Sequence, residues 1–309
     1  MRYYFLGFSA FAFGTKKSKW SLFFSLNVQP NYSYNLHKKM KKISFYLFVG
    51  LLAISCKTNK MVYSDPVPKH DRLVIKSEFV NEERIINVWT PPQYEQSTET
   101  FPVLYMPDGG IKEDFPHIAN TLATLLEEKK IPLFILVGIE NTQRGRDLTG
   151  FSEAEYDKQF CPVTDGAKDF RAFIAEELIP EINKKYRIQS KKGIIGESLA
   201  GLFVMETFFL KPETFNFYIA MDPSLWWNNQ YLTKNADALL TDFPKQDIKL
   251  WFAGSSAEDI SVSTKSLEKT LQKNAPKNLQ WNYSNEPQEK HNTIFRATKE
   301  KALIWTLNE

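Results

Sequence analysis

The feature that most constrains this chain is a regular alternation of short apolar runs and amphipathic stretches from about residue 103 to the end. Apolar runs such as 132–139 and 215–221 suit strands that are buried on both faces, and the stretch 169–186 has the spacing of a helix. This alternation predicts a mostly parallel sheet covered by helices on both faces. No linker interrupts the pattern, which predicts a single α/β domain over residues 69–309.

Two further strands precede the alternating part. Residues 72–79 and 84–90 are rich in β-branched and aromatic side chains and flank the turn Asn81-Glu82-Glu83. They predict an antiparallel hairpin packed at one edge of the sheet. Within the helical stretch 169–186, Pro180 predicts a kink.

Composition and charge exclude several classes of protein. A hydrophobic fraction of 43% can bury a large core, and two cysteines cannot form a disulfide scaffold or a cysteine-rich zinc site. Residues 1–56 hold eight basic and no acidic residues, which leaves 31 basic against 36 acidic residues in 57–309. The net charge of +3 therefore belongs to the leader. We predict no metal, no organic cofactor and no nucleic-acid partner.

The leader contains the parts of an export signal between residues 40 and 56. Lys41 and Lys42 precede the apolar run 43–54, which is shorter than the ~20 residues that span a bilayer. Its ending at Ser55-Cys56 resembles a bacterial lipoprotein signal, so we expect Cys56 to carry a lipid anchor after cleavage. An uncleaved short anchor or a buried helix is the alternative.

This leader predicts an exported protein of the periplasm or cell envelope, held to the membrane through lipidated Cys56. Residues 57–68 read as a polar tether between the anchor and the domain. Residues 1–39 lack any targeting pattern, and translation assigned from too early a Met explains them.

The sharpest motif is Gly196-Glu197-Ser198-Leu199-Ala200-Gly201, between an apolar strand and an apolar helix. A serine in a tight strand-to-helix turn exposes its hydroxyl and needs small neighbours. Ala200 replaces the last glycine of the Gly-x-Ser-x-Gly pattern but is still small. Ser198 is therefore the candidate nucleophile, with helix capping as the alternative.

A serine nucleophile needs a base and a group that orients the base. His291 is the one histidine that follows Ser198, in a polar loop after the last predicted strand. The loop after strand 248–253 offers Glu258 and Asp259 as the acid. Asp259 is slightly favoured, and a Ser–His dyad without a firm acid stays open.

An oxyanion hole needs two N–H donors. The residue after the nucleophile, Leu199, is the first candidate, and Gly109 or Gly110 after strand 103–106 is the second. An ordinary turn would also use these glycines.

Several ordered segments resemble one known family. They are Val103–Gly110, Val137–Asn141, Arg144–Thr149, Gly196–Gly201, Met221–Trp227 and Glu289–His291. Residues 72–305 are similar to the branch of the α/β hydrolases that includes esterase D and the siderophore esterases. The resemblance implies an α/β-hydrolase fold, with Ser198 as nucleophile and His291 as base.

The resemblance also suggests roles for residues near the strand ends. Arg144 and Arg146 follow a strand where ligands of α/β folds bind, so they are candidates for holding an anionic or catecholate-type acyl group. Surface salt bridges are the alternative. Trp226 and Trp227 are candidates for the wall of the substrate pocket, with lid or core packing as the alternative.

The sequence thus predicts a serine hydrolase that cleaves small carboxylic esters through a triad and an acyl-enzyme. One alternative is a surface lipoprotein that binds ligands on a hydrolase fold without turnover. Another is a peptidase or acyltransferase that uses the same serine.

Overall fold

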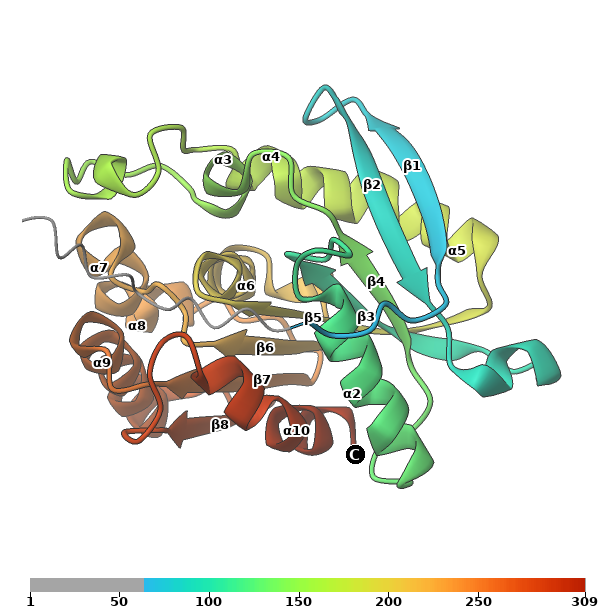
Figure 1. Ribbon diagram of the computed structural model, residues 1–309. Helices are drawn as coiled ribbons and strands as arrows, with labels where there is room; N and C mark the ends of the chain where they lie inside the picture. Colours follow the sequence, from blue (N-terminus) through green and yellow to red (C-terminus); the bar gives the residue numbers. More distant parts are fainter. Residues whose placement is uncertain (1–63, 309) are drawn as a thin grey trace, which may run out of the picture. The chain divides into compact units, whose positions relative to one another are not determined.

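Eight strands form one sheet within residues 64–308, the part of the chain that the computed structural model describes (Figure 1). Their spatial order is β1-β2-β4-β3-β5-β6-β7-β8. The strands are β1 (Asp71–Ser77), β2 (Glu82–Trp89), β3 (Phe101–Pro107), β4 (Ile135–Ile139), β5 (Ile188–Glu197), β6 (Phe217–Met221), β7 (Ile248–Gly254) and β8 (Leu279–Asn285). The predicted leader and Cys56 lie outside the described residues.

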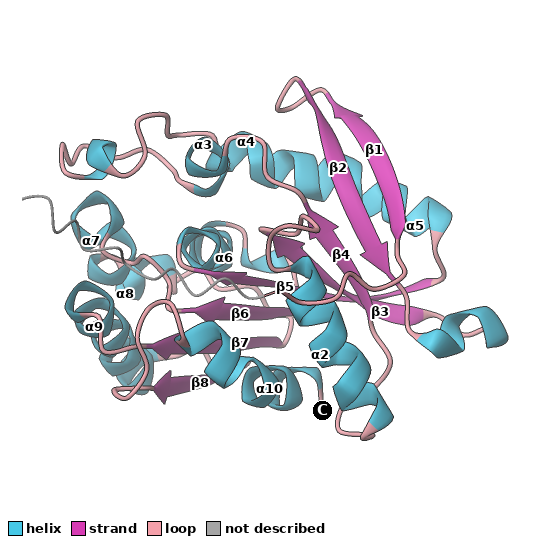
Figure 2. Ribbon diagram, in the orientation of Figure 1, coloured by secondary structure: helices cyan, strands magenta, loops and turns pink. Residues whose placement is uncertain are grey.

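The sheet is parallel except at one edge. β1 pairs with β2 antiparallel, and β2 pairs with β4 antiparallel, whereas all later neighbours are parallel. The mostly parallel sheet and its antiparallel N-terminal hairpin are therefore confirmed. Figure 2 shows the hairpin as the two long strands at one side of the molecule.

Helices connect the strands on both faces of the sheet. The α-helices are α2 (Phe115–Glu127), α3 (Arg144–Leu148), α4 (Ala167–Ala172), α5 (Ile179–Lys185), α6 (Leu199–Leu210), α7 (Trp227–Lys234), α8 (Ala236–Leu239), α9 (Glu258–Asn274) and α10 (Ile294–Leu307). In residues 64–308, no helix combines the length and the apolarity that crossing a lipid bilayer requires.

Successive residues of a strand lie on opposite faces of the sheet and pack into two separate cores. Val103 and Tyr105 of β3 pack with α4, α6 and α9, whereas Leu104 and Met106 pack with α2 and α10 on the other face. The period of two along a strand explains this division. Strands with both faces covered need apolar residues at every position, which is why they appear as continuous apolar runs in the sequence.

Two helical regions differ in detail from the sequence prediction. The stretch around Pro180 passes through a π-helical segment, Phe173–Leu178, before α5. Proline lacks an N–H, and a π-helical turn accommodates the missing hydrogen bond without breaking the helical run. The helical stretch 227–239 is divided into α7 and α8 at Asn235, a break that the alternating pattern does not predict.

The parallel strands place their carboxyl ends at one edge of the sheet. In Figure 2 the arrowheads of β6 and β8 point the same way, toward α7 and the loop that precedes α10. Ser198, Asp222 and the 286–293 loop follow β5, β6 and β8 respectively, so the topology brings them together. Open α/β sheets bind their ligands at this edge.

Candidate active site

Ser198 occupies a strained turn between β5 and α6. Its φ and ψ are 60° and −117°, a conformation that non-glycine residues rarely adopt. A Cβ on Gly196 would come within 2.6 Å of the Ala200 backbone, so only glycine fits there. The methyl group of Ala200 faces this glycine, which explains why alanine is accepted at the departure from the usual motif. Strain of about 1–3 kcal/mol is typical of such functional turns.

His291 and Asp222 complete a chain of hydrogen bonds that begins at Ser198. The Ser198 Oγ lies 3.0 Å from His291 Nε2, and His291 Nδ1 lies 2.6 Å from Asp222 Oδ2. The Asp222 side chain is fully buried, and it also accepts hydrogen bonds from the Ser255 backbone N–H and hydroxyl at 2.6 and 2.8 Å. These bonds fix the carboxylate against the imidazole ring.

The expectation that Asp259 or Glu258 orients His291 is wrong in this structure. Both residues begin α9, where Glu258 is exposed and Asp259 lines the cavity without a hydrogen bond to His291. Asp222 instead follows β6, the strand beside β5, and so lies nearer the serine. An acid directly after the buried run Phe217–Met221 was the sequence signal that could have identified it.

Several carboxylates stabilise the protonated form of His291. The hydrogen bond that His291 Nδ1–H donates to Asp222 raises the pKa of His291 above its ordinary value. Burial opposes this effect, whereas the charges of Glu197, Asp222 and Asp259 add to it. An imidazole held in this way has a fixed ring orientation and a stabilised protonated form.

The glycines expected in the oxyanion hole have other partners. The Gly109 N–H donates to the Ile139 carbonyl at 2.9 Å, and the Gly110 N–H donates to Glu113 Oε2 at 2.7 Å. A Cβ on Gly109 would lie 2.3 Å from the Gly138 Cα, so this glycine permits close packing against β4. Leu199 lines the cavity beside Ser198, at the first position of α6.

The two candidate arginines are both bound to carboxylates. Arg144 donates from Nε and Nη2 to the two oxygens of Asp108, each at 2.7 Å, and still lines the cavity. Arg146 pairs with Glu82 and Asp147 at 2.6 and 2.7 Å and is not part of the cavity lining. Arg146 therefore joins the hairpin to α3, as the salt-bridge alternative expected.

A cavity of about 440 Å³ opens above Ser198. Its walls include aromatic, apolar and charged side chains, namely Arg144, Phe160, Leu199, Ser224, Trp226, Ala257, Asp259, Ile260 and His291. The rings of Phe160 and Trp226 are in contact, with centroids 5.2 Å apart. Trp226 thus walls the cavity, as expected.

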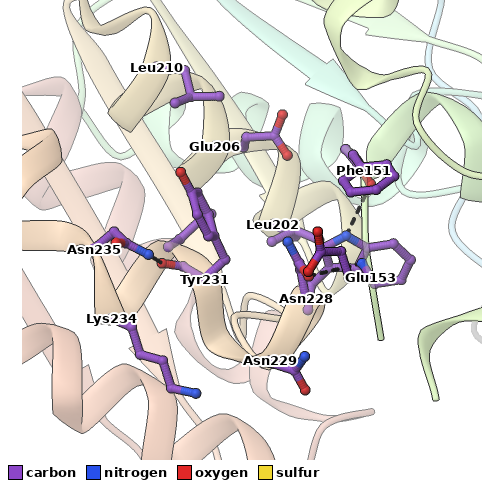
Figure 3. Close-up of a pocket in the computed structure, with 13 residues that line it drawn as sticks. Phe151, Glu153, Leu202, Glu206, Leu210, Asn228, Asn229, Tyr231, Lys234 and Asn235 are labelled. Atoms are coloured by element: carbon purple, nitrogen blue, oxygen red, sulfur yellow. Dashed lines mark hydrogen bonds between the residues drawn. The ribbon is translucent and has the colours of Figure 1, made fainter. Parts of the chain in front are cut away.

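Trp227 is not part of the lining of this cavity. It lines a second groove of about 570 Å³, which Figure 3 shows. Its indole Nε1 donates to the Gly150 carbonyl at 3.1 Å. Figure 3 shows Glu206 and Leu210 of α6 on one side of the groove and Tyr231 and Asn235 on another. Only one of the two tryptophans therefore belongs to the cavity that contains the serine.

Glu197 is a site residue that the sequence reasoning missed. Its Oε1 lies 3.8 Å from His291 Nε2, and the side chain is 18% exposed. Burial raises the pKa of Glu197 to about 8. The Gly-x-Ser-x-Gly pattern leaves the residue between glycine and serine unspecified, so it assigns no role to this position. Among residues 64–308, no group of His, Cys, Asp and Glu is arranged to hold a metal ion.

Comparisons with known proteins match this geometry to a family. The Esterase family model, described as "Putative esterase", matches residues 77–302. Ferri-bacillibactin esterase BesA of Bacillus subtilis is 40% identical over 100 residues, which are 31% of this chain and 35% of BesA. Apo-salmochelin esterase of Escherichia coli O6:H1 is 27% identical over 160 residues, which are 48% of this chain and 49% of that protein. The chain thus spans half or less of the length of these two relatives.

Solved structures share the same fold. An IroE-like serine hydrolase from Shewanella oneidensis superimposes with a TM-score of 0.71 at 26% identity, covering 77% of this chain and 79% of that one. The BES protein from Bacillus cereus gives a TM-score of 0.68 at 23% identity, covering 80% and 98%. These matches confirm the α/β-hydrolase architecture and the family resemblance read from the sequence motifs.

Proposed function

Because the chain belongs to the Esterase family, we propose that it is a serine hydrolase that cleaves carboxylic esters of small molecules. The observation that carries the proposal is the continuous hydrogen-bonded relay Ser198–His291–Asp222 in an open cavity. A nucleophile, a base and a buried acid in this order form the arrangement that acyl transfer requires.

In the first step, Ser198 Oγ attacks the ester carbonyl carbon while His291 Nε2 accepts the hydroxyl proton. Asp222 keeps the Nδ1–H in place and stabilises the imidazolium that forms. When the tetrahedral intermediate collapses, His291 returns the proton to the leaving alcohol oxygen, and the acyl group stays on Ser198. Water then repeats the sequence and releases the acid.

The charge that develops on the carbonyl oxygen needs N–H donors. The Leu199 amide, at the start of α6, is our candidate for one donor. Gly110 can supply a second only after its N–H leaves Glu113, because the two are hydrogen-bonded in the free protein. Gly109 is not proposed as a donor, since its N–H is used by β4.

The cavity suggests what part of a substrate it contacts. Phe160 and Trp226 provide an aromatic wall, whereas the charge of Arg144 is balanced by Asp108. The named relatives are siderophore esterases, which supports testing siderophore-type esters first. The paired arginines give no support to a dedicated site for an anionic acyl group.

We also propose that the protein is an exported envelope lipoprotein, because of the signal-like stretch 40–56. Its membrane association would come from lipidated Cys56. No nucleic acid is expected as a partner.

The change Ser198→Ala tests the catalytic proposal. We expect it to abolish hydrolysis of p-nitrophenyl acetate and labelling by a fluorophosphonate probe, while circular dichroism and the melting temperature stay close to wild type. Ser266→Ala, at an exposed position of α9, is the matched control and should change neither readout.

Two experimental outcomes would favour a different function. A wild-type protein that neither labels nor hydrolyses any ester would indicate a binding lipoprotein on a hydrolase fold. Labelling at Ser198 combined with cleavage of peptides, or with acyl transfer to an alcohol in preference to water, would indicate a peptidase or an acyltransferase.

A further inference from the structure

Glu197 is a buried carboxyl group that the proposed mechanism leaves unused. It sits at the last position of β5, directly before Ser198, so the strained turn fixes its side chain at the site. Within residues 64–308 its carboxyl group forms no hydrogen bond; its close contact is His291 Nε2 at 3.8 Å. That nitrogen is the one that exchanges a proton with Ser198.

More acidic than basic groups surround the contact between Glu197 and His291. His291 is faced by Asp222 after β6, by Glu197 of β5 and by Asp259 of α9. Glu197 is itself faced by Arg144 of α3 and by Asp108 and Asp114 in the connection from β3 to α2. Arg144 is the nearby cation of this set, and its guanidinium is already bound at both Nε and Nη2 to Asp108. Glu197 is therefore only partly neutralised by a neighbouring arginine.

We propose, resting on the serine-hydrolase function above, that Glu197 is a positioning residue that stabilises the His291 imidazolium from its Nε2 edge while Asp222 holds the Nδ1 edge. The proton moves from Ser198 Oγ to Nε2 as the Oγ–carbon bond forms and the carbonyl π pair moves to oxygen. It then moves from Nε2 to the leaving oxygen as the carbon–oxygen bond breaks. Glu197 exchanges no proton in either step and acts by its charge alone.

This arrangement makes the contribution of Glu197 depend on pH. Burial raises the pKa of Glu197 to about 8, so its negative charge is largely present only at alkaline pH. Where Glu197 is ionised, its charge stabilises the imidazolium that forms in the transition state. Below that pH range a neutral Glu197 has no such effect. The contribution of Glu197 to catalysis therefore grows as pH rises through about 8.

The test is the pH profile of Glu197→Gln, measured as kcat/KM with p-nitrophenyl acetate from pH 5.5 to 9.5. We expect kcat/KM of wild type and variant to agree within about twofold below pH 7, because Glu197 is then largely uncharged and glutamine is its neutral isostere. At pH 9 we expect kcat of the variant to be roughly 3- to 10-fold lower, which corresponds to up to one pKa unit of lost stabilisation. The two profiles should therefore coincide at low pH and separate above about pH 8.

A second readout does not depend on turnover. The ring resonances of His291, assigned in ¹³C-labelled protein by comparison with His291→Asn, should shift near pH 8 in wild type as Glu197 ionises, and Glu197→Gln should lack this shift. Glu258→Gln is the matched control, because that carboxylate is exposed and does not line the cavity. It should keep the shift near pH 8.

The outcomes separate this inference from the function on which it rests. If the pH profiles of wild type and Glu197→Gln coincide up to pH 9.5, and the variant keeps the His291 shift near pH 8, the role of Glu197 is overturned. Fluorophosphonate labelling of wild-type Ser198 would still leave the hydrolase proposal intact. Absence of fluorophosphonate labelling in wild type at every pH would instead overturn the hydrolase proposal itself.

Discussion

At the scale of the residue, Asp222 is held in place more firmly than an acid on a surface loop could be. Its φ is 47°, its side chain is fully buried, and Ser255 donates hydrogen bonds to both of its carboxylate oxygens. A buried carboxylate with several donors keeps one orientation, which in turn selects one tautomer of the imidazole.

Asp222→Asn should therefore lower kcat by about 10³- to 10⁴-fold, because an amide can donate to Nδ1 and favour the wrong tautomer. The measurement is kcat for p-nitrophenyl acetate at a pH where wild type is fully active. Asp259→Asn and Glu258→Gln are the controls and should stay within about threefold of wild type. A loss larger in Asp259→Asn than in Asp222→Asn would restore the acid that the sequence favoured.

The serine and the histidine were predictable as residues, whereas the acid was not. A small-residue motif between a strand and a helix identifies a nucleophile by local sterics, and His291 was the one histidine in the right chain order. Asp222 follows β6, whereas Glu258 and Asp259 both follow β7, and only the packing of these strands in space decides which carboxylate reaches the ring.

At the scale of the element, α7 begins with a turn of left-handed backbone conformation. Asn228, Asn229 and Gln230 have φ values of 46°, 54° and 66° in succession. The buried Asp157 carboxylate accepts the Asn228 N–H at 2.7 Å, and the Glu153 N–H donates to Asn228 Oδ1 at 3.1 Å. These contacts pin the 150–157 segment against α7 and help hold the strained turn.

Gln230→Gly should stabilise the protein, because glycine adopts left-handed angles without steric cost. A non-glycine residue there costs about 1–2 kcal/mol, so we expect the free energy of unfolding to rise by roughly 1 kcal/mol. For a chain of this size, the melting temperature should rise by about 2–4 °C. Thermal and urea unfolding measure the change.

Lys265→Gly supplies the opposite control, at an exposed right-handed position of α9. It should lower the free energy of unfolding by about 1 kcal/mol. Equal destabilisation by both substitutions would show that the left-handed turn of α7 is not strained. Since Gln230 lies outside both cavities, esterase activity should not change.

The helices and strands could largely be predicted from hydrophobic periodicity, whereas their irregularities could not. The buried parallel strands and the hairpin follow from apolar runs and turn residues. The π-helical segment before Pro180 and the left-handed start of α7 depend on what packs around them, which no local pattern reports.

At the scale of the whole molecule, the charge is divided between two dissimilar parts. The leader is wholly basic, whereas residues 57–309 carry a net negative charge. The described residues hold no candidate membrane span. In our proposal the attachment to the membrane comes from lipidated Cys56.

Cys56→Ser should move the protein from the membrane fraction to the soluble fraction of an expressing bacterium and remove incorporation of labelled palmitate. The mature wild-type protein should begin at lipidated Cys56 in mass spectra. Cys161→Ser is the control, because that thiol is buried inside the domain and should not affect fractionation. A mature N-terminus upstream of residue 40 would contradict the lipoprotein proposal.

The sequence by itself determined the fold class and the candidates for nucleophile and base, because each depends on local pattern: apolar period, small residues around a serine, and chain order. Only the tertiary structure decided which groups surround them. Strand order brought Asp222 to His291, pairing removed Arg146 from the site, and the strained turn aimed Glu197 at the imidazole. These contacts depend on distances between residues that are far apart in the chain. Tertiary packing sets those distances, and a local sequence pattern does not report them.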